Sequence, residues 1–158
     1  METGQVKFRL GCDPEVFTVD AKTGKFLSII GCIGAGKDNP FQIPHLPNGF
    51  TLQEDNVAME FGIPPAASAD EFVTHIQKVM QEGLSKVPGR TFSNLSCTIF
   101  PEDQMEDPLA FMFGCEPDFN AWTGKENPRP KPPHALMRSA GGHVHIETKL
   151  DPKNVGRS

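Results

Sequence analysis

Hydrophobic and polar residues alternate with a period of two along several short stretches of this chain. Such alternation is typical of β-strands that bury one face and expose the other. Thr23-Gly24, in the middle of residues 20–25, indicates a hairpin turn between two of these stretches. The pattern therefore predicts short strands at residues 6–10, 55–61 and 143–147, and we also expect strands at 26–30, after the turn, and at 91–100.

One stretch has a helical period instead. Apolar residues recur at spacings of three and four, at positions 72, 73, 76, 79, 80, 84 and 87. Ser68-Ala-Asp-Glu71 has the form of a capping box before this run, and Pro88-Gly89 follows it. The spacing predicts a helix from about residue 69 to residue 86. One helix among short strands predicts an α+β fold, and we expect a strongly curved antiparallel sheet with the helix on its convex side.

The last predicted strand carries two histidines on one face. In residues 141–147, two glycines precede alternating residues, so that His143, His145 and Glu147 share a face. Val144 and Ile146 point to the other side, which we expect to be the core. Buried imidazoles need a partner for each ring nitrogen, such as a metal ion or a phosphate. The alternative is an exposed strand with two solvated histidines.

Carboxylates occur in the same kind of setting. Asp13 and Glu15 are separated by Pro14 and would share one face of an extended segment. Glu60 lies in the predicted strand 55–61, opposite its apolar residues. With His143 they form a set rich in oxygen with a single nitrogen, which suits Mg²⁺ or Mn²⁺ better than Zn²⁺. Each carboxylate alone would more commonly be a solvated surface charge.

Composition excludes several function classes. The 158 residues are enough for one domain, and the net charge of −5 comes without any run of lysine or arginine. Neither a nucleic acid nor an anionic membrane is therefore an expected partner. The first residues are not those of a signal peptide, and no stretch approaches 18 apolar residues, so we expect a cytoplasmic protein. The four cysteines are too scattered for a disulfide scaffold.

Residues 31–37 have the spacing of a phosphate-binding P-loop. Asp38 follows where a P-loop has the serine or threonine that holds magnesium. Asn39-Pro40 then prevents the helix whose amino terminus would receive the phosphates. We interpret the segment as a turn-rich loop, from which Lys37 could still reach a ligand.

Four motifs occur in order along the chain, namely residues 11–17 (GCDPEVF), 55–61 (DNVAMEF), 114–120 (GCEPDFN) and 138–145 (RSAGGHVH). Together they resemble the phage-type carboxylate-amine ligases (amidoligase type 2), which belong to the superfamily with the glutamine synthetase catalytic fold. The similarity extends from about Leu10 to Ile146.

The resemblance implies roles for individual residues. Asp13 and Glu15 match the paired carboxylates of an early strand in glutamine synthetase-like enzymes, and Glu60 matches a further metal-binding glutamate. His143 matches the histidine that binds the second metal ion. These four residues are the predicted metal ligands.

The remaining roles concern ATP and the substrates. The resemblance implies that His145 contacts phosphate, and Lys37 is the second candidate for cofactor binding. Arg138 and Asp118 lie in motifs typical of the phage-type group. We expect Arg138 to be catalytic and Asp118 to bind substrate.

The implied function is ATP-dependent formation of an amide from a carboxylate and an amine, through an acyl phosphate, with Mg²⁺ or Mn²⁺. The substrates would be small molecules or peptides, in the host cytoplasm if the protein is phage-encoded. A metal-dependent hydrolase is a weaker interpretation, because no nucleophile or general base stands out. A non-catalytic phage binding or assembly protein on the same scaffold is the main alternative.

The resemblance also implies that residues 1–158 are a single amidoligase-like domain that is incomplete at its carboxy terminus. In the superfamily, arginines and a further acidic ligand follow the histidine strand, whereas here Arg157 is the only arginine that follows it. Three explanations are open: a longer product, a homo-oligomer or second chain that completes the site, and a scaffold that has lost catalysis.

Overall fold

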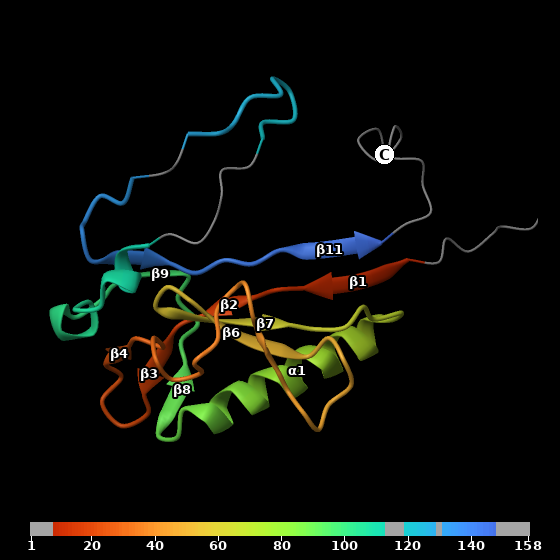
Figure 1. Cartoon of the computed structure of the whole chain (residues 1–158), viewed down its shortest axis with the longest axis horizontal. Helices are drawn as coiled ribbons and strands as arrows, with labels where there is room; N and C mark the ends of the chain where they lie inside the picture. The colour runs from red at the N-terminus through yellow and green to blue at the C-terminus, as the bar shows by residue number, and fades with distance from the viewer. Residues whose placement is uncertain (1–7, 113–118, 129–130, 148–158) are drawn as a thin grey trace, which may run out of the picture.

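The computed structural model of the protein describes residues 8–112, 119–128 and 131–147. These residues form short β-sheets and one α-helix (Figure 1), and all the strand pairings between them are antiparallel. The predicted α+β class is confirmed at this level. The described residues include no helix long and apolar enough to cross a membrane.

Two adjoining sheets contain the strands of the predicted site. The larger has the order β2-β7-β6-β5. Its strands are β2 (Glu15–Val16), β5 (Phe41–Gln42), β6 (Thr51–Asp55) and β7 (Ala58–Gly62). The other sheet pairs β1 (Arg9–Cys12) with β11 (Val144–Glu147), as Figure 1 shows. Asp13-Pro14 separates β1 from β2, as expected of a proline at a strand interruption.

The remaining strands lie in two further sheets. β3 (Thr18–Asp20) lies between β4 (Phe26–Leu27) and β8 (Arg90–Phe92), while β9 (Cys97–Ile99) pairs with β10 (Met137–Ser139). Two short 3₁₀ helices, η1 (Glu102–Gln104) and η2 (Pro108–Phe111), follow β9.

The prediction of one strand over residues 91–100 is wrong. β8 and β9 lie in different sheets, and the residues between them form no strand. The Ser93 hydroxyl accepts a hydrogen bond from the Leu95 amide, 3.1 Å away, and this local bond favours a turn over a strand ladder.

The helix α1 (Ala69–Lys86) has the predicted bounds. The Ser68 hydroxyl accepts a hydrogen bond from the Glu71 amide at 3.2 Å, and the Glu71 carboxylate accepts one from the Ala67 amide at 2.7 Å. These reciprocal bonds satisfy amides that the first helical turn leaves unpaired.

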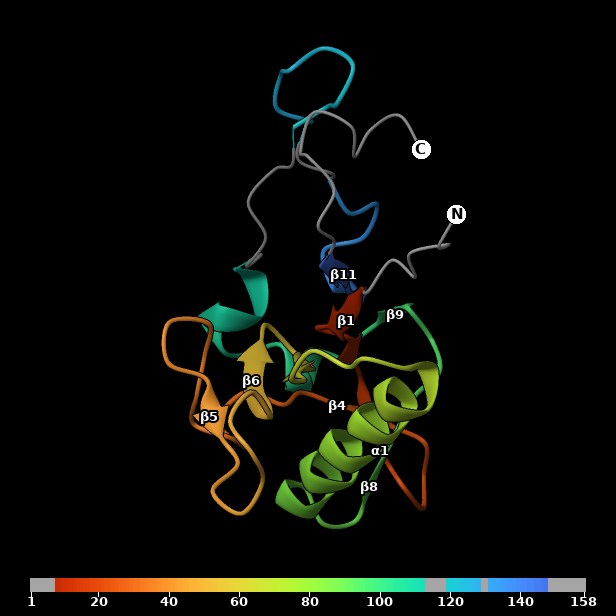
Figure 2. The same ribbon diagram turned by 90° about the vertical axis from the view of Figure 1, so that its right-hand side faces the viewer.

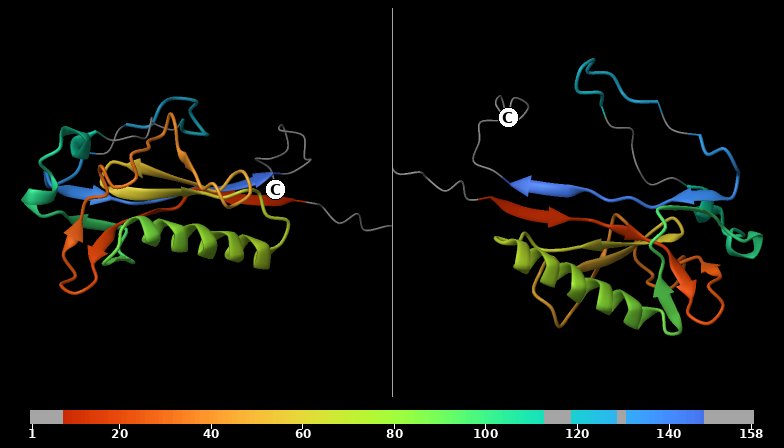
Figure 3. Two further views of the ribbon diagram at one scale, coloured as in Figure 1. Left: turned by 60° about the horizontal axis from the view of Figure 1, so that its bottom comes forward. Right: turned by 180° about the vertical axis from the view of Figure 1, so that it is seen from behind.

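α1 covers one face of the β6–β7 hairpin. It lies along one side of the strands in Figures 2 and 3. Met59 and Phe61 are fully buried and pack close to Gly83, where even a Cβ atom would come within 2.8 Å of the Phe61 ring. Glu60, between them in β7, therefore points to the face that α1 does not cover, as the alternation predicts. We call this the open face.

The predicted strand 55–61 is also divided. β6 ends at Asp55 and β7 begins at Ala58, so Asn56 and Val57 form a two-residue hairpin turn. Asn56 has a φ of 56°, a left-handed conformation that asparagine tolerates better than most residues. The chain reverses there, and Asp55 lies on a strand paired with that of Glu60.

The expectation that Val144 and Ile146 enter the core is wrong. Their side chains are 65% and 64% exposed. Among the described residues, β11 pairs with β1 alone. The helix α1 does not fully cover the face of β11 on which Val144 lies. An apolar groove of about 250 Å³ lies there, and it is lined in part by Val144, Phe72, Ile76 and Met80.

Candidate metal and phosphate site

Three carboxylates gather on the open face. Glu15, Asp55 and Glu60 each offer an oxygen within 4.8 Å of the others, an arrangement that could hold a metal ion. We call these three residues the acidic cluster. All three are half-buried.

The strand register positions the cluster. Glu15 of β2 lies directly opposite Glu60 of β7, and Gln53 of β6 lies opposite Glu60 on the other side. The Gln53 amide donates to the Glu60 carboxylate at 2.6 Å. The Glu15 carboxylate accepts from the Gly141 amide at 2.8 Å, so each glutamate keeps a fixed donor.

Burial raises the pKa of Glu60 to about 7. The Gln53 hydrogen bond opposes this rise, while the negative charges of Asp55, Glu15 and Asp13 add to it. Burial also raises the pKa of Glu15, with Asp55 adding to the effect and the Gly141 amide opposing it. A divalent cation would relieve the repulsion among these carboxylates, as oxygen-rich sites commonly do.

Asp13 lies between the two histidines of the predicted motif. Its Oδ1 is 3.3 Å from His143 Nδ1, and its Oδ2 is 3.5 Å from His145 Nε2. Its Oδ1 also accepts from the His143 amide at 2.8 Å. Both histidine side chains are two-thirds exposed, at 67% and 66%. They therefore border the open face from its surface.

A glycine allows the histidine segment to approach the Asp13-Pro14 interruption. A Cβ atom on Gly142 would lie 2.9 Å from the Pro14 Cα, and its φ of 153° is one that few other residues adopt. The Asp13 amide donates to the His143 carbonyl, and the Glu15 amide donates to the Gly141 carbonyl. These contacts join the histidine segment to the carboxylate segment.

The four predicted metal ligands lie in two neighbouring groups, because Glu15 and Glu60 belong to the acidic cluster and Asp13 and His143 form a separate pair. Asp13 contacts His143, Glu15 lies opposite Glu60, and the charge of His143 lowers the pKa of Glu15. Their roles as ligands stay a prediction.

Asp55 is the member that sequence reasoning missed. In a single strand over residues 55–61, Asp55 would point to the same face as the apolar residues, and Glu60 would point to the other face. The hairpin turn at Asn56 instead places Asp55 on a neighbouring strand, on the same face as Glu60. Asp55-Asn56, two residues that favour turns, was the available signal for the turn.

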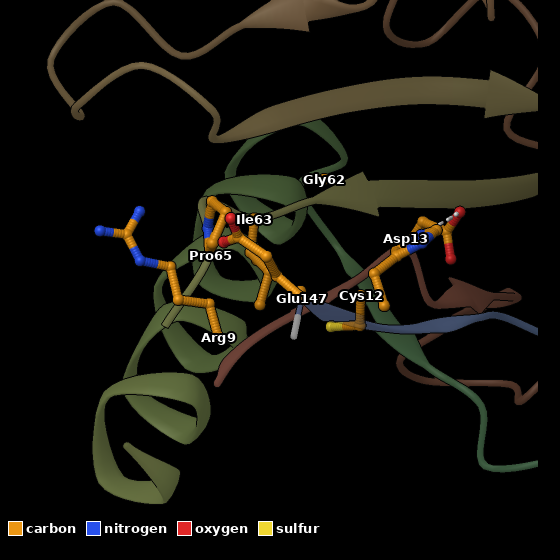
Figure 4. Close-up of a pocket in the computed structure, with 9 residues that line it drawn as sticks. Arg9, Cys12, Asp13, Gly62, Ile63, Pro65 and Glu147 are labelled. Atoms are coloured by element: carbon orange, nitrogen blue, oxygen red, sulfur yellow. Dashed lines mark ion pairs between the residues drawn. The ribbon is translucent and has the colours of Figure 1, made fainter. Parts of the chain in front are cut away.

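A groove of about 310 Å³ extends along β1 and β11 next to these residues. Figure 4 shows Asp13 at one end of it and Arg9 at the other, with Ile63 and Pro65 between them. His145, Glu147, Cys12, Gly11 and Gly62 complete its lining. A groove with an apolar wall and charges at its ends could hold an elongated polar ligand.

The loop with P-loop spacing holds a carboxylate of the protein itself. The Glu54 side chain accepts hydrogen bonds from the amides of Gly31, Ile33 and Gly34 at 2.7 to 3.0 Å. Such a ring of amides is a common anion site, and here Glu54 occupies it. Lys37 lines a separate cavity of about 360 Å³, which Asp55 also lines. Lys37 thus lies beside a cavity that adjoins the acidic cluster.

Arg138 has a structural setting in β10, which pairs with β9. Its side chain is buried, Nε donates to the Ala110 carbonyl at 2.6 Å, and Nη1 donates to the carbonyls of Ala135 and Met137. Its guanidinium also stacks on the Phe111 ring at 4.9 Å. These contacts fasten β10 to η2, and the predicted catalytic role stays a prediction. Asp118 lies outside the described residues.

Comparisons of the chain with protein-family models, curated proteins and solved structures give no significant match.

Proposed function

We propose that the protein is an ATP-dependent carboxylate-amine ligase of the glutamine synthetase-like type, and that its site is the open face. The observation that carries this proposal is the grouping of Glu15, Asp55 and Glu60 beside the Asp13–His143 pair. The order of the sequence motifs supports the same conclusion. We also propose that the sheet has the curvature of the glutamine synthetase fold.

The proposed reaction has two steps. An oxygen of the substrate carboxylate attacks the γ-phosphorus of ATP, and ADP leaves. The neutral amine then attacks the acyl carbon, and inorganic phosphate leaves and takes up the proton that the amine loses, so that an amide remains. Mg²⁺ or Mn²⁺ would supply charge neutralisation at the phosphates.

The residues of the open face would divide this work. Glu15, Asp55 and Glu60 would hold one cation, and Asp13 with His143 would hold a second. His145, which lines the groove, would donate to a phosphate oxygen. This donation is compatible with the two-thirds exposure of its side chain.

Other parts of the proposal rest on the sequence motifs. Lys37 would approach the nucleotide from its own cavity, Asp118 would bind substrate, and Arg138 would provide a cation. A homo-oligomer or second chain would complete the charge around the transferred phosphoryl group. The substrates would be small-molecule or peptide carboxylates and amines, in a host cytoplasm if the protein is phage-encoded.

A non-catalytic phage binding or assembly protein on the same scaffold is the second candidate. The setting of Arg138 favours it, because three backbone carbonyls already accept from the guanidinium of the one candidate catalytic cation. A phosphoryl-transfer site loses about a hundredfold to a thousandfold in rate for each charge contact that is missing.

The deciding experiment is equilibrium dialysis of radiolabelled ATP against the purified protein at pH 8, with and without Mg²⁺. The ligase proposal predicts ATP binding that requires Mg²⁺ and is lost in Glu60→Gln but kept in Glu102→Gln, a matched change at an exposed position. ADP release coupled to amide formation would then identify substrates. Metal binding without ATP binding would favour the non-catalytic candidate.

A further inference from the structure

β11 has one unpaired edge among the described residues. The carbonyls of Gly141 and His143 accept from the Glu15 and Asp13 amides, so the odd-numbered residues of this segment bond toward β1 and β2. Backbone groups alternate in direction along a strand. The amides and carbonyls of Val144 and Ile146 therefore point away from β1, and no described residue bonds to them.

The side chains along this edge differ between its two faces. Val144 and Ile146 are exposed apolar residues on the face toward α1. On the open face, His143 and Glu147 flank His145, with a basic side chain at one end and an acidic one at the other. An exposed edge with apolar side chains is a template for pairing with another strand.

We propose that two copies of this chain associate by antiparallel pairing of β11 with β11, about a two-fold axis at His145. In this register Val144 lies opposite the partner's Ile146, and both residues have outward-pointing amides and carbonyls. The two equivalent pairs form four backbone hydrogen bonds. Each pair also places an aliphatic side chain against another on the apolar face.

The same register gives charge complementarity on the open face. His143 lies opposite the partner's Glu147, and this contact occurs twice because the axis repeats it. Registers shifted by two residues pair less of the strand or oppose like side chains. One places His143 opposite the partner's His145. The other also forms two His–Glu pairs, between His145 and the partner's Glu147, but it leaves His143 and Val144 without a partner in the strand. Registers shifted by one residue would set polar side chains against the apolar face.

This association goes beyond the proposed function and does not depend on it. It joins the two open faces into one continuous surface, and it places the partner's Glu147 beside the Asp13–His143 pair. A metal-free, inactive protein would pair in the same way.

The first test is sedimentation velocity of the whole chain at concentrations of 5 to 200 µM, which is about the range of dissociation constants for moderate protein–protein affinity. Val144→Pro removes the outward amide without removing a bond to β1, since proline is tolerated where a strand's amide faces outward. Val144→Ala is the matched control, because it shortens the side chain but keeps the amide. We expect dimers for the natural sequence, dimers weakened up to about tenfold for Val144→Ala, and monomers for Val144→Pro.

A second test fixes the register and does not depend on the folding of the proline variant. His145→Cys places two thiols opposite each other at a pair without backbone hydrogen bonds, where the Cα atoms are about 4.5 Å apart and a disulfide can form. We expect an oxidised dimer with a 145–145 link by mass spectrometry, and no such link for Glu147→Cys alone. A natural chain that stays monomeric, a dimer unaffected by Val144→Pro, or equal self-linking of both cysteine variants would overturn the proposal.

Discussion

Glu60 combines burial with three neighbouring carboxylates, and its ionisation should be visible in stability. Because its pKa is raised to about 7 in the folded protein, the folded state keeps a proton that the unfolded state releases near pH 4.5. Its contribution to stability is thus fully present below that pH and is lost as the pH rises through about 7.

Glu60→Gln should remove this loss of stability at high pH, since glutamine stays neutral and its side-chain oxygen can still accept a hydrogen bond from Gln53. After allowance for solvent screening, we expect a gain of roughly 1 to 2 kcal/mol in the free energy of unfolding at pH 8. The gain should shrink toward zero at pH 4. Urea unfolding of both proteins from pH 4 to pH 8 measures this, and a gain that is the same at every pH would contradict the assigned environment.

Individual residues differ in how far the sequence could place them. Asp13 and Glu15 could be assigned to one face because they are two residues apart in an extended segment, and the histidines because alternation over residues 143–147 survives in the structure. Asp55 could not, because a turn one residue later decides its face. The backbone conformation of Asn56 is a local detail that periodicity does not report.

The helix α1 packs closely on the β6–β7 hairpin. At Gly83, a Cβ atom would lie 2.6 Å from Met59 Sδ and 2.8 Å from Phe61 Cε1. Alanine favours a helix by about 1 kcal/mol over glycine, yet overpacking a close-packed core costs about 1 to 3 kcal/mol.

We therefore expect Gly83→Ala to lower the free energy of unfolding by up to about 2 kcal/mol. The control is Gln77→Ala at an exposed position of the same helix, which should change stability by less than about 0.5 kcal/mol. Chemical unfolding monitored by circular dichroism gives both values. A stabilised Gly83→Ala protein would mean that α1 and β7 are further apart than described.

Elements were predictable where a local signal marks both of their ends. The capping box and Pro88-Gly89 enclose α1, and its bounds agree with the prediction. The strands within residues 55–61 and 91–100 share alternating patterns with their neighbours, so the pattern alone could not show where the chain turns. Apolar Val144 and Ile146 misled the prediction because alternation indicates two faces but not which neighbour covers them.

At the scale of the whole molecule, the site depends on pairings between distant parts of the sequence. β1 pairs with β11, and the Glu15 carboxylate bonds to the Gly141 amide 126 residues away. In the sequence, strand alternation assigned these residues to the polar faces of their strands, and the order of the motifs suggested that they lie close together in the fold. Neither gave the register that sets Glu15 opposite Glu60. That register depends on side-chain packing and turn geometry throughout the sheet.

The central claim is that the acidic cluster is a divalent cation site, and calorimetric titration with Mn²⁺ at pH 8 tests it most directly. The natural sequence should bind Mn²⁺ weakly, and more weakly at pH 6, because the proton on Glu60 competes with the cation. Glu60→Ala and Asp55→Asn should each abolish or greatly weaken binding without unfolding the protein, because removing one of three like charges relieves repulsion. Glu102→Ala should bind like the natural sequence. Unchanged Mn²⁺ binding by Glu60→Ala and Asp55→Asn, or no binding by the natural sequence at pH 8, would contradict the account.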